Sequence, residues 1–122
     1  MSLPHPLSND LAELIAHRLR AIAEPMRIKL LDRLRDGEAS VGDLVVATGA
    51  SQQNVSKHLT VLLEAGIVGR RKDGNRAFYR ITDAGVFALC DQVCGTIQRQ
   101  LAELGSLFEG VGQGRGGGGG SR

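Results

Sequence analysis

Two short helical patterns separated by a glycine constrain the fold of this chain more than any other feature. Ser40 and Asp43 have the spacing of a capping box, in which each side chain accepts a hydrogen bond from the other residue's backbone N–H. That first pattern closes at Gly49, and Ser51 then caps a longer one that runs to Ala65. A short helix, a turn containing glycine and a longer helix are typical of a helix-turn-helix.

The residues after Gly66 predict a β-hairpin. The segments "IVGRRK" and "AFYRIT" are rich in the residue types that favour strands. Between them, "DGN" contains the Asp-Gly pair that favours a tight hairpin turn. The sequence therefore predicts a mainly α fold with a small β-hairpin, the winged helix-turn-helix.

Further helices are predicted on both sides of this region. "SNDLAELIAHRLRAIAE" is amphipathic and Ser8 can cap it, while Pro25 suits the first turn of a second helix that stops at Gly37. A last helix is expected from Asp83 to about Phe108. Its apolar residues alternate at spacings of three and four, which is typical of a helix–helix dimer contact, although packing within one subunit is the alternative. This seam consists of Phe87, Cys90, Cys94, Ile97, Leu101, Leu104 and Phe108.

One face of the helix that starts at Ser51 has the chemistry of a DNA-reading surface. At about 100° per residue the apolar side chains fall on one arc and polar ones on another. The polar arc consists of Gln52, Gln53, Ser56, Lys57 and Thr60. Gln amides match the adenine edge, Lys suits guanine acceptors, and Ser or Thr serve a base or a phosphate. No carboxylate lies in the first turns to repel phosphates. His58 falls at the edge of the apolar arc, where a hydrogen-bonded structural role is expected.

Positive charge is concentrated in the same part of the chain. The net charge is only +2, but residues 51–82 hold six basic side chains against two acidic ones. Such a cationic segment on a near-neutral protein indicates a polyanionic partner. In the wing, the candidate DNA contacts are Arg70, Arg71, Lys72, Asn75 and Arg76. Because strand residues alternate between faces, only some of these can reach the DNA.

Length and composition exclude several classes of protein. The 122 residues suit one domain, expected over residues 8–109, between a flexible N-terminus (1–7) and a flexible glycine-rich tail (110–122). There is no apolar run long enough for a membrane span and no secretory signal, and two cysteines make no disulfide framework, so a cytoplasmic location is expected. An enzyme is not indicated, because the sequence has no nucleophile–base pair, no phosphate-binding loop and no metal cluster.

Residues 23–82 resemble the arsenical-resistance-regulator (ArsR/SmtB) family of bacterial winged-helix repressors. The resemblance rests on Pro25-Met26-Arg27, "SVGDL", "QNVSKHL", "EAGIV" and a "GN" wing. It implies a homodimer on an inverted-repeat operator of double-stranded DNA, with an inducer that lowers DNA affinity. It also implies a dimer interface made by the first and last helices, here Leu11, Ile15, Leu19, Phe87, Cys90, Cys94, Ile97, Leu101 and Leu104.

The sequence departs from the family at both of its known metal sites. Ser40 and Gly42 stand where the family has arsenic-sensing cysteines. At the zinc site of the last helix only Asp83 is retained, with Gly85, Thr96 and Arg99 at the other ligand positions. Neither metal site is therefore expected, and no cofactor is predicted.

Cys90 and Cys94 leave two interpretations open. Paired across a dimer, they could bind a soft metal or respond to oxidants. Alternatively they are two small apolar side chains in a helix seam, which is favoured because no nearby His or third Cys completes a metal shell. The predicted function is a homodimeric, sequence-specific transcriptional repressor. The alternatives are a thiol- or metal-responsive version and a winged-helix module that binds an acidic protein.

Overall fold

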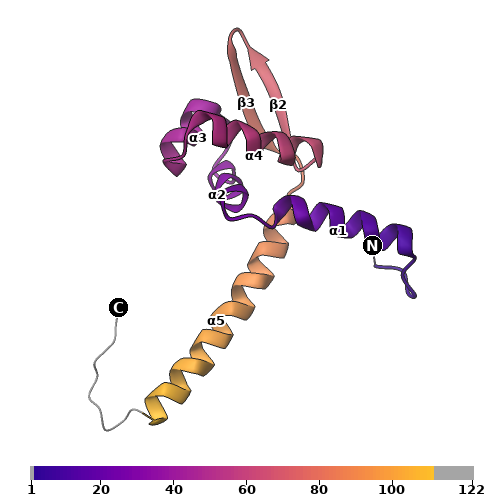
Figure 1. Cartoon of the computed structure of the whole chain (residues 1–122), viewed down its shortest axis with the longest axis vertical. Helices are drawn as coiled ribbons and strands as arrows, with labels where there is room; N and C mark the ends of the chain where they lie inside the picture. The colour runs from indigo at the N-terminus through magenta and orange to yellow at the C-terminus, as the bar shows by residue number, and fades with distance from the viewer. Residues whose placement is uncertain (1, 112–122) are drawn as a thin grey trace. The chain divides into compact units, whose positions relative to one another are not determined.

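The computed structural model describes residues 2–111, without the side chains of 109–111, and the chain divides into two units, Met1–Asp83 and Ala84–Arg122. The second unit contains α5 (Gly85–Val111). The elements of the first unit are, in order, α1 (Asn9–Ile22), α2 (Pro25–Leu34), β1 (Ala39–Ser40), α3 (Val41–Thr48), α4 (Gln52–Glu64), β2 (Val68–Asp73) and β3 (Arg76–Ile81). In this unit the hairpin of β2 and β3 extends beyond the helices (Figure 1). The element order confirms the predicted winged helix-turn-helix.

The helix boundaries follow the capping residues predicted from the sequence. Ser8 Oγ accepts a hydrogen bond from the backbone of α1, and Ser51 Oγ accepts one from the backbone of α4. Ser40 and Asp43 form the full capping box of α3, with distances of 3.0 and 3.1 Å. Gly49 ends α3 with a φ of 73°, a left-handed conformation that glycine adopts without a Cβ clash. Local signals therefore set the turn between α3 and α4.

The core of the first unit is aliphatic, as the scarcity of aromatic residues predicts. Its largest fully buried side chains come from α2, α3, α4 and the residue before β2; they are Leu30, Leu31, Leu44, Val55, Leu59, Leu62 and Ile67. Three of them lie along one face of α4, which fixes the opposite face of that helix toward solvent. The aliphatic arc predicted for α4 is therefore the face that it buries.

The sheet contains a strand that the sequence did not predict. β1 has two residues and pairs with β3, so the antiparallel order is β1-β3-β2. Ala39 lies opposite Tyr79 and Ser40 opposite Phe78. Two residues are too few to show the alternation by which strands are recognised. β1 ties the base of the hairpin to the start of α3, since Ser40 is both a strand residue and the cap of that helix.

α5 is displaced along the chain from the expected helix, because it begins at Gly85 rather than at Asp83. It continues through Gly110 to Val111, beyond the end expected near Phe108. The division into residues 1–7, 8–109 and 110–122 stays a prediction. Residues 112–122 of the expected glycine-rich tail lie outside the described part of the chain.

Candidate nucleic-acid interface

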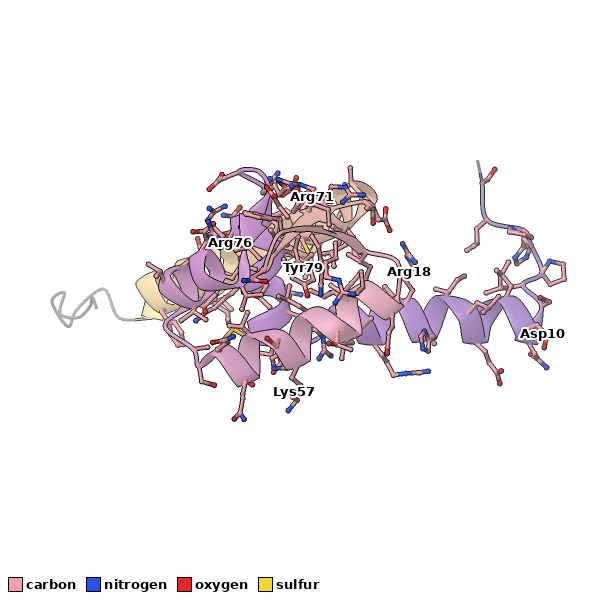
Figure 2. The ribbon with its side chains drawn as sticks, turned by 90° about the horizontal axis from the view of Figure 1, so that it is seen from above. Asp10, Arg18, Lys57, Arg71, Arg76 and Tyr79 are labelled. Atoms are coloured by element: carbon pink, nitrogen blue, oxygen red, sulfur yellow. The ribbon has the colours of Figure 1, made fainter. Side chains whose placement is uncertain are left out.

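α4 presents a polar face that carries no acidic side chain in its first turn. Gln52, Gln53, Lys57 and Thr60 are exposed and Ser56 is half-buried. Gln52 borders the apolar arc on the helical wheel, yet it belongs to the exposed set. Lys57 projects away from the ribbon (Figure 2). The helix thus offers amides, hydroxyls and an ammonium group to an external partner, with its positive N-terminal dipole at the same end.

The wing carries cations on two different faces. Residues that pair across strands share a face, so Arg70 lies on the face of Tyr79, whereas Arg71 lies on the face of Phe78. Near its base the Tyr79 face is buried, because Val68 and Tyr79 are only 2% and 7% exposed. Toward the turn, Arg70, Lys72 and Asn75 are exposed. Within residues 2–111 the side chains of Arg70 and Lys72 have no hydrogen-bond or ion-pair partner.

The Arg71 side chain is exposed but bonded to another residue of the protein. Its Nε and Nη2 donate to the two carboxylate oxygens of Glu38, each at 2.8 Å. Its guanidinium also lies 4.7 Å from the centre of the Phe78 ring. The Arg71 hydrogen bonds hold the pKa of the Glu38 carboxyl below its usual value, and Glu38 in turn raises the pKa of Arg71. Both groups are therefore charged near neutral pH.

Arg76 is engaged on the same side of the sheet. Its guanidinium lies 5.1 Å from the Phe78 ring centre, and its Nη2 donates to Ser40 Oγ at 3.3 Å. Sequence reasoning missed Glu38, Ser40 and Phe78 as parts of the wing. For Glu38 and Ser40 the missing signal was the register of β1, because that pairing brings them beside the two arginines. Phe78 lies opposite Arg71 within the hairpin itself.

His58 has the structural role that its position on the helical wheel predicts. It is 6% exposed, and its Nδ1 lies 3.0 Å from Nη1 of Arg27. A guanidinium can only donate, so Nδ1 is the acceptor. Arg27 also donates to the carbonyls of Ala21 and Arg20 at 2.7 and 3.2 Å. This arginine therefore connects α2, the end of α1 and the middle of α4.

A second arginine connects α1 to the end of α4. Nη1 of Arg18 donates to the carbonyl of Ala65 at 2.7 Å, and its Nε donates to Asp83 Oδ2 at 3.2 Å. Asp83 is the residue retained from the family's zinc site, and here it binds a guanidinium. Together, Arg18 and Arg27 fix both the middle and the C-terminal end of α4 against α1.

The other positions of that zinc site hold no metal-binding chemistry. Arg99 Nη2 donates to Thr96 Oγ1 at 3.2 Å, and a guanidinium cannot ligate a cation. Among the residues that the structure describes, no group of three or more His, Cys, Asp or Glu side chains could hold a metal ion. Cys90 is half-buried and Cys94 is exposed, and neither forms a disulfide.

The residues predicted for a dimer interface lie largely open in the single chain. On α5, Ile97, Leu101 and Leu104 are 48%, 61% and 48% exposed, while Phe87 is half-buried. Leu89 and Val93 are also exposed on this helix, and the sequence reasoning did not include them. On α1, Leu19 is exposed, and Leu11 and Ile15 are half-buried. None of the described helices has the length and apolar character that crossing a bilayer requires.

Known proteins are similar to this chain in both sequence and fold. Residues 24–69, from the cap of α2 into β2, match the family described as bacterial regulatory proteins of the arsR family. The biofilm growth-associated repressor of Xylella fastidiosa is 37% identical over 86 residues, which cover 68% of this chain and 75% of that protein.

Solved structures agree with the sequence matches. NolR from Sinorhizobium fredii is 30% identical with a TM-score of 0.68, covering 79% of this chain and 96% of NolR. The winged helix-turn-helix domain of Mb0332 from Mycobacterium bovis, described as homodimeric, is 32% identical with a TM-score of 0.66 and covers 78% of this chain and 91% of its own. The resemblance seen in the sequence is confirmed, as is the expectation of a regulator rather than an enzyme: the chain belongs to the ArsR family of bacterial winged helix-turn-helix transcriptional regulators.

Proposed function

We propose that this regulator is a homodimeric repressor that binds an inverted-repeat operator in double-stranded DNA and leaves it in response to a signal. The observation that carries the proposal is the exposed face of α4, which offers amides, hydroxyls and a lysine but no carboxylate in its first turn. A solvent-facing helix that only needs solubility carries acids and lysines together. Repression is the function in the name of the Xylella fastidiosa relative.

α4 acts as the reading helix in the major groove. Gln52 and Gln53 read base edges, and Lys57 suits the acceptors of guanine. Ser56 and Thr60 lie farther along the helix and take either a base or a phosphate. The Thr60 hydroxyl donates to the Ser56 carbonyl at 3.0 Å, so it faces the DNA chiefly as an acceptor.

The wing adds contacts to the strands beside the groove. The candidates are the five residues expected from the sequence, of which Arg71 and Arg76 also contact Glu38 and Ser40 within the protein: Arg70, Arg71, Lys72, Asn75 and Arg76. Each phosphate contact steepens the plot of log K, where K is the association constant for DNA, against the logarithm of the salt concentration by about 0.9 unit. Exposed cations on the wing therefore predict strongly salt-dependent binding.

The dimer places two reading helices on one face of the duplex. The exposed apolar seam of α5 supports this assembly, as does the homodimeric Mycobacterium bovis neighbour. The proposed contact uses Leu11, Ile15, Leu19, Phe87, Cys90, Cys94, Ile97, Leu101 and Leu104. Half-sites centred about 34 Å apart, one turn of DNA, follow from such a pair of helices. A repressor of bacterial genes acts in the cytoplasm, which is the location we propose.

Selection of bound sequences from random duplex DNA tests the proposal. We expect enrichment of an inverted repeat, and loss of that enrichment in Lys57→Ala. Lys29→Ala is the matched control, because Lys29 is an exposed lysine on α2 rather than on the face of α4. If no sequence is enriched and log K changes little with salt, the protein has no phosphate footprint. That result would favour a module that binds an acidic protein instead.

A further inference from the structure

The outer face of the wing links three strands through side chains. Glu38, which directly precedes β1, Phe78 on β3 and Arg71 on β2 all lie on this face. To reach Glu38 from β2, the Arg71 side chain crosses β3 over the Phe78 ring. Hydrogen bonds of the backbone join neighbouring strands only, so this ion pair is what connects β2 to the start of β1.

The same face is joined to the helix-turn-helix. Ser40 Oγ accepts a hydrogen bond from Arg76 at 3.3 Å and another from the backbone N–H of Asp43 at 3.1 Å. Ser40 is 4% exposed and caps α3. A serine that holds both the wing arginine and the first turn of α3 fixes the hairpin relative to the helices that precede α4.

Close packing at the base of the hairpin continues this arrangement. A Cβ at Gly69 would lie 3.1 Å from the Arg80 guanidinium carbon and 2.9 Å from Cγ2 of Thr82. Arg80 therefore lies across β2 at Gly69, on the face that Arg71 and Phe78 share. Its charge helps to lower the pKa of Glu38. On this face Arg71 and Arg76 are thus engaged by Glu38, Ser40 and Phe78, whereas Arg80 is exposed.

The opposite face, which carries Tyr79, has among the described residues cations without a partner near the hairpin turn. Arg70 and Lys72 are exposed there, and within residues 2–111 their side chains have no partner. Arg71 would give up two charge-assisted hydrogen bonds if it turned its Nε and Nη2 from Glu38 to a phosphate. It would also leave the Glu38 carboxylate unpaired beside a polyanion. Arg70 and Lys72 would give up nothing.

We propose that the two faces of the wing have different tasks: Arg71, through Glu38 and Phe78, is a positioning residue that holds the hairpin against the start of α3, while Arg70 and Lys72 bind the phosphates. This assignment rests on the proposed DNA-binding function and divides its wing residues into two groups. Arg70 and Arg71 are adjacent arginines on opposite faces, so the chain supplies its own matched pair.

Glu38→Gln separates positioning from direct contact, because the two roles predict opposite signs. If Arg71 contacts phosphate, neutralising Glu38 frees it and binding becomes tighter. If Arg71 positions the wing, the weakened pair loosens the hairpin, and binding to a random-sequence duplex should weaken about two- to fivefold, the range of an exposed ion pair. Asp73→Asn is the comparison variant: it also removes a negative charge beside Arg71, but Asp73 is 74% exposed and lies 3.9 Å from Nη1 of Arg71 without a hydrogen bond to it, so its loss should loosen the hairpin less.

Two further measurements complete the test. Arg70→Ala should lower the slope of log K against log salt by about one unit. In the protein without DNA, amide hydrogen exchange in β2 and β3 should be faster in Glu38→Gln and Arg71→Ala and unchanged in Arg70→Ala. Tighter DNA binding by Glu38→Gln, or unchanged exchange in it, overturns the assignment. If the unmodified protein shows no salt-dependent binding to duplex DNA, the proposed function fails instead, and the exchange experiment still tests the positioning role.

Discussion

Replacing Arg27 by Met tests whether one guanidinium holds α4 against its neighbours. The substitution keeps much of the apolar length of the side chain and removes three donated hydrogen bonds. Two go to the carbonyls of Ala21 and Arg20 at the end of α1, and one goes to Nδ1 of His58. Since His58 is only 6% exposed, water cannot replace the lost donor.

The expected cost follows from these contacts. A buried acceptor left without a partner costs about 1–3 kcal/mol, and each ordinary hydrogen bond that is lost costs about 0.5–1.5 kcal/mol. Because Arg27 is only half-buried and water reaches the carbonyls, the sum lies toward the lower end. We expect Arg27→Met to lower the free energy of unfolding by about 2–4 kcal/mol.

Urea unfolding followed by circular dichroism measures this change. All variants need one protein concentration, because dimer formation adds to the apparent stability. Lys29→Met is the control, since it removes an exposed charge from the same helix. In a double-mutant cycle, His58→Phe should offset part of the loss in Arg27→Met, because it removes the unpaired nitrogen. A loss no larger than that of Lys29→Met, or the absence of coupling to position 58, would refute the reasoning.

Three other outcomes are expected. Gln53→Ala should cost about 1–3 kcal/mol on the selected operator and less on random DNA, and equal losses on both would limit Gln53 to the DNA backbone. Leu101→Glu places a charge in the α5 seam and should give a monomer in sedimentation equilibrium; a persistent dimer would remove Leu101 from the interface. Replacing both Cys90 and Cys94 by Ser should not alter the effect of thiophilic metals or oxidants on release from the operator. If the variant loses a response that the unmodified protein shows, the thiols are the sensor.

Local signals account for most of the elements that the sequence predicts correctly. The caps at Ser8, Ser40 and Ser51, and the turn at Gly49, depend on residues within three or four positions of each other. The apolar arc of α4 follows in the same way from helical periodicity. These features could be predicted because the groups that determine them are neighbours in the chain.

The features that were missed depend on residues far apart in sequence. β1 exists because Ala39 and Ser40 find Tyr79 and Phe78, and no periodicity within two residues announces that pairing. The roles of Arg18 and Arg27 were also missed, because each binds partners on other elements. Neither side chain differs in type from an arginine that simply faces solvent.

The charge count of the wing shows how contacts between distant residues affect a prediction of function from the sequence. Residues 51–82 hold a strong excess of basic side chains, and that excess correctly indicates a polyanion. Glu38 lies outside the counted segment, yet its carboxylate neutralises Arg71 within it. The number of cations near a predicted wing is therefore an upper limit on its phosphate contacts. For this protein the measured salt dependence should correspond to fewer contacts than the sequence has basic residues, with Arg70, Lys72 and Lys57 carrying most of it.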